Sequence, residues 1–391
     1  MDTNSTGGFQ NEFIDAYRDQ AQKLGRFNLA VFGKTGAGKS SLVNAIFGES
    51  VARTGIGKPV SAGTTYYEHP SGNFGMFDCV GFETGESGDQ ILGALRSTVE
   101  DLRGRPITEQ IHVVWYVLRW SDRRFEDTQV DFIRELRRMG LPVVMVLSQV
   151  PVLADGQPHP EAQVLADLIA QEMGDEIVTG RPLMTNSVAD PHLSQPVHGL
   201  MPLLEATFRA APNGVREALV AVQRIDSAIK RRECHGIIAT ASGAAAGIGA
   251  VPIPFADVAL LLPTQVTMMA TVATRYALPV DAGTVGSLAV AATLAGGTAS
   301  WAGRGLANML KMIPGVGSAA GGAINATVAA TLTTAIGYAW LAVCEFLATQ
   351  TPEQIERHLR DGSTLRARFY DEFRNLGRNP EEDDGPEHTA A

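Results

Sequence analysis

Hydrophobic runs of strand length recur along the first half of the chain. They cover residues 27–32, 75–78, 111–118, 142–147 and 182–185. Between the later runs, apolar residues lie three or four positions apart, as in residues 125–139, and this spacing predicts amphipathic helices. Strands that alternate with helices indicate a doubly wound, mostly parallel sheet with helices on both faces. The predicted fold class of this half is therefore α/β.

Two charged helices are expected to border this domain. Residues 11–24 carry apolar side chains at helical spacing, which predicts an N-terminal amphipathic helix within residues 1–24 that packs on the domain that follows it. The strand and helix pattern ends near residue 212, where Ala-Pro-Asn-Gly interrupts it. We therefore expect a domain over residues 25–212 and a single connecting helix over residues 213–235.

The second half has a different composition. Only five charged side chains occur between Gly236 and Cys344, namely Asp257, Arg275, Asp281, Arg304 and Lys311. The rest is mostly Ala, Gly, Thr, Val and Leu, and about four helices are expected in an all-α apolar domain over residues 236–350. Polar helices should follow over residues 351–378. The last residues, 379–391, form an acidic tail whose low apolar content predicts disorder.

Composition excludes some functions. The net charge is -10 over 391 residues, and such an acidic chain lacks the basic surface that general nucleic-acid binding requires, so no DNA partner is expected. The three cysteines form no CxxC pair, which fits a reducing compartment. The N-terminal residues are polar and carry an acidic residue, unlike a signal peptide. We expect a cytoplasmic location.

The sequence GKTGAGKS at residues 33–40 matches the pattern GxxxxGK[ST] between a predicted strand and a predicted helix. Glycines let the backbone N–H groups curve around phosphates, the lysine contacts the β- and γ-phosphates, and the serine hydroxyl reaches Mg²⁺. The predicted nucleotide contacts are Gly33, Lys34, Thr35, Gly36, Ala37, Gly38, Lys39, Ser40 and Ser41.

A second motif, Asp78-Cys79-Val80-Gly81, follows an apolar strand and matches the DxxG pattern. Asp78 is predicted to hold Mg²⁺ together with Ser40, and the amide of Gly81 to contact the γ-phosphate. The alternative is that Asp78 only caps a turn. The stretch before this strand, residues 56–66, is expected to be a flexible loop in which Thr65, or else Thr64, completes the Mg²⁺ shell.

From residue 27 to residue 211 the chain resembles the Era-like GTPases, and its phosphate loop is also similar to that of the immunity-related GTPases. The resemblance implies GTP and GDP as ligands, Mg²⁺ as the cofactor, and Lys39, Thr65 and Gly81 as the catalytic groups. It also implies that a partner, or a homodimer or oligomer formed through this domain, can assist hydrolysis.

Two departures from these families concern base selectivity and rate. Guanine is usually read by the aspartate of an NKxD motif, whereas this chain has Ser148-Gln149-Val150-Pro151, and proline offers no carboxylate. Gln149 and Ser187 are the predicted base contacts. GTP is favoured, with broader base selectivity as an accompanying interpretation. Phe82 stands where Ras-type GTPases carry the water-orienting glutamine, so intrinsic hydrolysis should be slow.

The residue that supports potassium-dependent hydrolysis in some of these GTPases is also absent. Gly36 replaces the phosphate-loop asparagine of the potassium-dependent members, so that route to hydrolysis is not expected. Arg123 and Arg124 follow the predicted strand over residues 111–118, where an arginine can reach a neighbouring site, but a solvated surface pair is the favoured interpretation.

The uncharged runs of the second half are long enough for a bilayer span, which needs about 20 apolar residues, but they are rich in Ala, Gly and Thr. A compact helical domain with small residues at close helix crossings, such as Gly243 and Gly247, fits equally well. Residues 230–345 resemble a small apolar helical domain found C-terminal to bacterial Era-like GTPases and in some inner-membrane proteins. This resemblance implies a lipid partner at the inner face of the cell membrane.

The sequence therefore predicts a bacterial GTP-binding switch with slow hydrolysis, coupled to an apolar and membrane-associated helical domain. The alternative is a nucleotide-binding scaffold that oligomerises on loading and hardly hydrolyses. A third reading, an ATP-dependent transferase, lacks any sign of an acceptor site.

Overall fold

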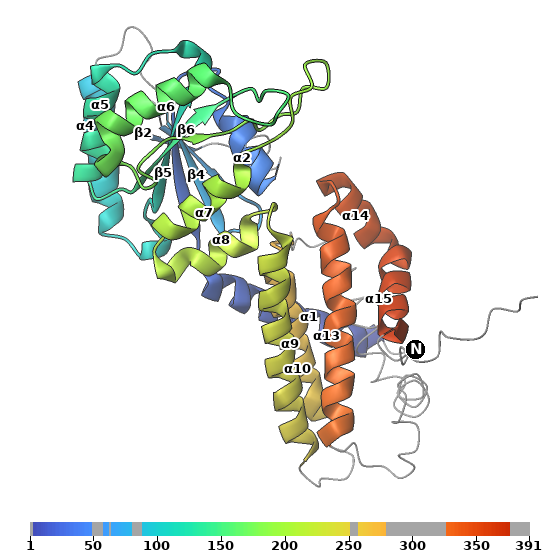
Figure 1. Cartoon of the computed structure of the whole chain (residues 1–391). Helices are drawn as coiled ribbons and strands as arrows, with labels where there is room; N and C mark the ends of the chain where they lie inside the picture. The colour runs from blue at the N-terminus through green and yellow to red at the C-terminus, as the bar shows by residue number, and fades with distance from the viewer. Residues whose placement is uncertain are drawn as a thin grey trace, which may run out of the picture. The chain divides into compact units, whose positions relative to one another are not determined.

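The structure is a computed structural model that describes residues 3–48, 58–61, 64–79, 88–250, 257–278 and 326–375. It divides into two compact units (Figure 1). The sheet unit comprises Leu24–Ser227, and the helical unit comprises Met1–Lys23 together with Ala228–Ala391. Each unit has its own hydrophobic core.

The sheet unit is built on a seven-stranded sheet with the order β2-β3-β4-β1-β5-β6-β7. β1, β4, β5, β6 and β7 are parallel, whereas β3 runs antiparallel to both β2 and β4. The strands are β1 (Phe27–Phe32), β2 (Lys58–Ser61), β3 (Thr64–Glu68), β4 (Phe74–Cys79), β5 (Val113–Arg119), β6 (Val143–Ser148) and β7 (Leu183–Met184). This mostly parallel sheet confirms the predicted α/β class.

Helices cover both faces of the sheet (Figure 1). One face carries α4 (Gly88–Arg103), α5 (Asp127–Arg138) and α6 (Pro160–Met173), and the other carries α2 (Lys39–Phe47), α7 (Leu200–Ala210) and α8 (Arg216–Val222). Short 3-10 turns lie at Ile107–Glu109, Trp120–Asp122, Gly174–Glu176 and Asn213–Val215.

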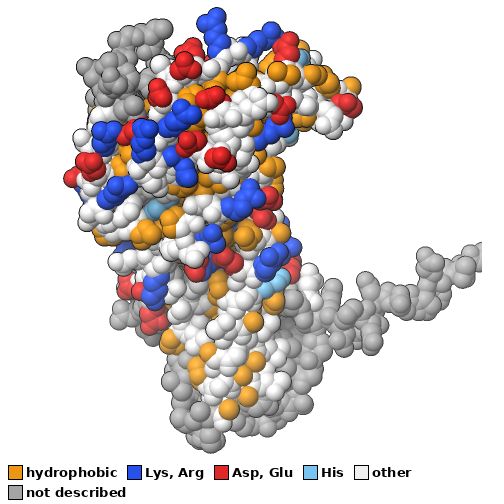
Figure 2. Space-filling view, turned by 60° about the vertical axis from the view of Figure 1, so that its left-hand side comes forward, with side chains coloured by type: hydrophobic (Ala, Val, Ile, Leu, Met, Phe, Trp, Pro, Cys, Tyr) orange, Lys and Arg blue, Asp and Glu red, His pale blue; other side chains and the backbone are white. Residues whose placement is uncertain are grey.

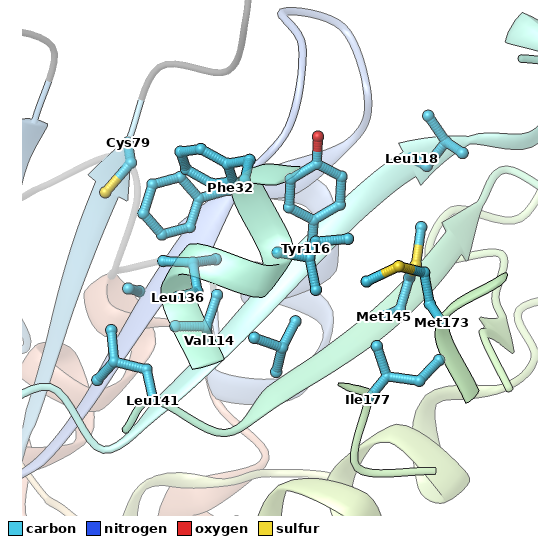
Figure 3. Packing of buried hydrophobic residues seen from close by; sticks show 14 of the residues in the cluster. Phe32, Cys79, Val114, Tyr116, Leu118, Leu136, Leu141, Met145, Met173 and Ile177 are labelled. Atoms are coloured by element: carbon cyan, nitrogen blue, oxygen red, sulfur yellow. The ribbon is translucent and has the colours of Figure 1, made fainter. Parts of the chain in front are cut away.

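Each face has aromatic residues in its core. Under α5, the rings of Phe32 and Phe132 meet edge to face with centroids 5.1 Å apart, and Tyr116 and Leu136 lie beside them (Figure 3). On the other face, Trp115 is fully buried, stacks on Phe47 and donates its indole N–H to Thr207 Oγ1 at 3.0 Å. Packing on both faces therefore fixes the strands, so that the loops at the C-terminal edge of the sheet begin at fixed positions.

All five predicted strands occur, with shifts of one or two residues at their ends, but β2 and β3 were not predicted. They lie in the stretch that was expected to be a flexible loop, residues 56–66. β3 alternates a buried Thr64, whose Oγ1 lies 3.7 Å from Cys79 Sγ, with a half-buried Thr65. Because its residues are mostly polar or aromatic and it pairs near the sheet edge, it lacks the apolar run that marked the other strands.

The helical unit packs six described helices around one core. They are α1 (Thr3–Leu24), α9 (Ser227–Gly249), α10 (Asp257–Arg275), α13 (Ala326–Ala348), α14 (Pro352–Asp361) and α15 (Ser363–Asn375). Trp340 is fully buried near the centre, donates its indole N–H to Met269 O at 2.8 Å and meets the Phe13 ring edge-on.

The N-terminal helix differs from its prediction. It was expected to pack on the domain that follows it, but Phe13 and Tyr17 belong to the core of the helical unit, and Tyr17 Oη–H donates to Leu278 O at 2.6 Å. The amphipathic pattern identified the apolar face of α1 correctly, but it could not identify which part of the chain packs against that face. The polar helices α14 and α15 join the same core through Leu359, Phe369 and other apolar residues.

The predicted single connecting helix over residues 213–235 is also wrong. The chain forms α8, leaves helical geometry at Gln223 and begins α9 at Ser227. Gln223 is completely buried, and its amide bonds both the N–H and the C=O of Asp226 at 2.8 Å. This side chain therefore satisfies the backbone groups of a break that charge and periodicity did not reveal.

Small residues mark a close helix crossing, at a place that the sequence did not single out. A Cβ on Gly337 would lie 2.8 Å from the Ile238 side chain and 3.0 Å from Met268 Sδ, so α9, α10 and α13 approach closely there. By contrast, no described atom lies within 4 Å of a Cβ placed on Gly243 or Gly247.

Two further expectations concern the apolar helices. Of the four expected between residues 236 and 345, α9, α10 and α13 are described, and residues 279–325 lie outside the described part. Among the described helices, α13 alone is long and apolar enough to cross a membrane, and 67% of its most apolar window is buried inside the unit. A buried core helix meets the same criterion.

Candidate functional site

The P-loop, residues 33–40, connects β1 to α2 at the C-terminal edge of the sheet. Gly33 has a φ of 147°, and a Cβ there would lie 2.3 Å from Val117 O, so only glycine lets the loop pass so close to β5. Gly38, at the start of α2, also has a positive φ, of 86°. The loop thus delivers the backbone N–H groups at the beginning of α2 to one anion-sized position.

Lys39 lies over this loop. Its Nζ donates to Gly33 O at 2.7 Å and to Lys34 O at 3.4 Å, which holds the ammonium group above the loop at the N-terminus of α2. Its positive charge and the positive end of the helix dipole act at the same place. Both favour a phosphate group. Ser40, Ser41, Thr35 and Gly36 are exposed along the loop and the start of the helix.

Ser148, the last residue of β6, and Gln149, which follows it, both hydrogen-bond to the P-loop, and only Gln149 was predicted to belong to the site. Ser148 is 4% exposed, and its Oγ–H donates to Ala37 O at 2.6 Å. Gln149 Nε2–H donates to Gly36 O at 3.0 Å. These bonds occupy the carbonyl groups of the loop, so that its N–H groups remain for an anion. A polar residue that ends a fully apolar strand was the signal for Ser148.

Asp78 lies in β4 next to the strand that feeds the P-loop, in register with Val31 of β1. Burial raises the pKa of its carboxyl group, and the positive charge of Lys39 lowers it, with burial the larger effect. Thr65 is the register partner of Asp78 on β3, so both side chains point to the same face of the sheet. Gly81 and Phe82 lie outside the described residues.

The chemistry of these groups fits Mg²⁺. This hard cation prefers oxygen ligands and usually keeps several waters beside one or two protein groups and the phosphates. Asp78 supplies a partly desolvated carboxylate, and Ser40 an exposed hydroxyl in the first turn of α2. Among the described residues no group of three His, Cys, Asp or Glu side chains could hold a metal ion by itself.

On the base side, the loops after β6 and β7 begin beside the P-loop. Gln149 has a φ of 58° and is fixed to Gly36, whereas its aliphatic stem was expected to lie on the base. Ser187 is half-buried at the start of the loop after β7. Pro151 carries no polar side chain.

Arg123 has a local partner. Its guanidinium pairs with Glu161 of α6 at 2.5 Å, and both side chains are more than half exposed. This arrangement agrees with the surface-pair interpretation.

Family models agree with this geometry. Residues 28–149 match the model described as a 50S ribosome-binding GTPase, and residues 215–364 match one described as a domain of unknown function (DUF697). The chain contains a P-loop GTPase domain followed by a DUF697 domain. The GTPase model ends at Gln149, the residue whose amide holds the P-loop, and the DUF697 model spans α8 to the first residues of α15.

Several solved structures are similar to this chain. The probable GTP-binding protein engB is 18% identical, covers 49% of this chain and 99% of its own, and has a TM-score of 0.32. Era of Aquifex aeolicus bound to GDP·AlF4⁻ is 14% identical, with 56% of this chain and 67% of its own covered and a TM-score of 0.32. The GDP-bound NFeoB of S. thermophilus is 12% identical, with 90% and 97% covered and a TM-score of 0.30. No curated protein matches the chain.

Proposed function

We propose that this protein is a GTP-binding switch with slow intrinsic hydrolysis, whose sheet unit passes its nucleotide state to the helical unit. The observation that carries the proposal is the P-loop with Lys39 held over it, beside the half-buried carboxylate of Asp78. Lys39 and the N-terminus of α2 bind the phosphates, and Asp78 with Ser40 holds Mg²⁺, which supplies charge stabilisation to the transferring phosphoryl group.

Slow turnover follows from the sequence next to Asp78. Phenylalanine at position 82 can neither donate nor accept the hydrogen bond that orients an attacking water, and Arg123 pairs with Glu161. A low rate would let the protein remain loaded with GTP long enough to act on a partner.

The path to the helical unit runs through the residues between α8 and α9. Arg224 N–H donates to Ile46 O at 2.7 Å at the end of α2, the helix that the P-loop begins. Arg224 also packs on Gly48, where a Cβ would lie 2.6 Å from its Nε. A nucleotide-dependent shift of α2 would therefore reach Gln223–Asp226, and the chain continues directly from these residues into α9.

We also propose that the helical unit associates with a membrane. α9 beyond Glu233, α10 and α13 up to Cys344 carry only Asp257 and Arg275 among their described charged residues. On the face of the helical unit that Figure 2 shows, the described side chains at its lower end are mainly apolar or uncharged. The burial of α13 favours association of the whole helical unit over a crossing by α13 alone.

Hydrolysis and hydrogen exchange test the switch together. Purified full-length protein should release phosphate from GTP at well below one turnover per minute, in the range typical of unassisted GTPases. The amides of α9 should exchange at different rates with GTP and with GDP, and Lys39→Ala should abolish that difference while Lys23→Ala, at an exposed position of α1, keeps it. Fast turnover, or exchange in α9 that ignores the nucleotide, would contradict the switch.

Flotation tests the membrane association. The protein should float with vesicles of bacterial lipid composition, and a chain truncated after Arg224 should not. Oligomerisation on GTP loading without measurable hydrolysis would instead favour the scaffold function.

A further inference from the structure

The two loops on the base side of the P-loop are bound to each other and to the P-loop. One runs from Ser148 to His159 after β6, and the other from Asn186 to Gly199 after β7. A nucleotide whose phosphates lie on the P-loop extends its base along this C-terminal edge of the sheet, where ligands of doubly wound folds bind. The hydrogen-bonding groups of these two loops therefore determine which base the site accepts.

Polar groups of the first loop near the site are hydrogen-bonded to other parts of the protein. Ser148 and Gln149 donate to carbonyl groups of the P-loop. Val150 N–H donates to Thr185 O at 3.0 Å, and Val150 O accepts from His198 Nε2 at 2.8 Å. Pro151 has no side-chain donor or acceptor, and Pro151 O accepts a hydrogen bond from His159 N–H at 2.9 Å.

The second loop is similarly occupied. Asn186 N–H donates to His198 O at 3.1 Å, and its side-chain amide donates at 2.9 Å to Val188 O and to Pro196 O. Gln195 joins the loops, since its Oε1 accepts from Val152 N–H at 2.7 Å and its Nε2–H donates to Val152 O at 3.2 Å. These bonds fix both loops and engage the amide groups of Asn186 and Gln195 within the protein.

The remaining polar side chains of the loops do not discriminate between bases. Asp155 Oδ1 accepts from Gln157 N–H, and Asp190 Oδ1 accepts from the N–H groups of His192 and Leu193, so each carboxylate holds a turn of its own loop. The Ser187 hydroxyl can both donate and accept, and it therefore suits either purine.

Guanine and adenine differ only in their hydrogen-bonding edges. Guanine presents N1–H and an amino group as donors and O6 as an acceptor, whereas adenine presents an amino donor and an N1 acceptor. A site separates them strongly only when its own buried donors or acceptors are left unpaired by the wrong base. In the described loops after β6 and β7, the carboxylates of Asp155 and Asp190 hold turns, so neither is placed to pair with the donors of guanine.

We propose that the site binds nucleoside triphosphates of both purines, GTP and ATP, with similar affinity. It reads the triphosphate and Mg²⁺ through the P-loop and holds the base by shape and apolar contact. This inference rests on the proposed function and widens its substrate class, because the polar side chains after β6 serve to clamp the P-loop.

Competition for a fluorescent GDP derivative with Mg²⁺ present tests the proposal on the full-length protein. GTP and ATP should displace it with dissociation constants within about five-fold of each other, and Lys39→Ala should weaken both. A preference for GTP of 50-fold or more that still depends on Lys39 would overturn the inference and leave the proposed function standing. Absence of displacement by either triphosphate would overturn the proposed function as well.

A variant designed to gain selectivity for guanine tests whether position 151 lies at the base. Pro151→Asp adds a carboxylate that can accept the two donors of guanine, and it should tighten GTP by roughly ten-fold or more while leaving ATP unchanged. Ala154→Asp adds the same charge at an exposed position of the same loop and should leave the ratio near one. An unchanged ratio in a folded Pro151→Asp protein would overturn the assignment of position 151 to the base side.

Discussion

The sheet unit and the helical unit solve the burial of apolar surface in different ways. The sheet unit places aromatic and branched side chains between a hydrogen-bonded sheet and its helices, with Trp115 and Phe132 fully enclosed. The helical unit relies on small residues that let helices approach, on one central tryptophan and on ion pairs such as Arg231 with Glu345 at 2.7 Å. A ligand site with fixed geometry lies on the first unit, because parallel strands deliver several loops to one edge.

The largest expected effect is in the helical unit. Trp340→Ala removes the fully buried ring that Phe13 and Met269 contact and should destabilise this unit by about 3–5 kcal/mol. GTP binding by the sheet unit should persist. Calorimetry with GTP titration on the same sample checks both, and Trp120→Ala at a partly exposed position is the control. Loss of GTP binding in Trp340→Ala would contradict the separation of the two units.

The clamp on the P-loop is expected to have the next largest effect. Ser148→Ala leaves Ala37 O without its 2.6 Å hydrogen bond in a buried place and should cost about 1–3 kcal/mol of stability. It should also weaken nucleotide binding, because the loop is less well ordered. Urea unfolding and GTP titration measure the two effects. Thr128→Ala on the exposed face of α5 should change neither, and wild-type behaviour of Ser148→Ala would show that the clamp is dispensable.

Two glycines of the helical unit should respond with opposite signs to the same substitution. Gly337→Ala forces Ile238 and Met268 apart and should destabilise the unit by about 1 kcal/mol. Gly243→Ala meets no described atom and should stabilise α9 by about 0.5–1 kcal/mol through helix propensity. Thermal unfolding of both variants decides the point. Equal shifts would mean that the helices do not cross closely at Gly337.

The smallest predicted effect concerns pH and the sheet unit. His112 Nδ1 accepts from Asn28 N–H at 2.8 Å, so Nε2–H donates to Ile107 O at 2.6 Å, and burial lowers the pKa of this histidine. The unfolded chain therefore binds a proton at higher pH than the folded chain, and the sheet unit should lose stability as pH falls below about 6.5. His112→Gln should flatten this dependence, whereas exposed His235→Gln should not. An equally steep loss of stability with falling pH in His112→Gln would refute the assignment of this pH dependence to His112.

The sequence predicted the sheet unit better than the helical unit, for a physical reason. In the sheet unit apolar runs alternate with polar breaks, so the ends of β1 and the position of the P-loop followed directly. In residues 236–344 nearly every position is uncharged, so periodicity could not show that Gly337 lies at a crossing while no described atom lies near a Cβ on Gly243. The long-range contact of Tyr17 with Leu278 was likewise invisible, and so was the local break at Gln223.

In the candidate site, the residues that belong to a sequence motif were predictable, whereas the residues that hydrogen-bond to the motif from elsewhere in the chain were not. GKTGAGKS and Asp78 stand out by their spacing, whereas the clamp by Ser148 depends on the register between β6 and the P-loop. Thr65 was chosen as a loop residue, and the structure places it in a strand opposite Asp78.

Equilibrium binding of GTP to the full-length protein, by titration calorimetry with and without Mg²⁺, tests the central claim most directly. The account predicts tight binding that weakens when Mg²⁺ is removed and is lost by about 100-fold or more in Lys39→Ala, with the folded state of that variant unchanged. Binding that is indifferent both to Mg²⁺ and to Lys39 would contradict the assignment of residues 33–40 and Asp78 as the nucleotide site.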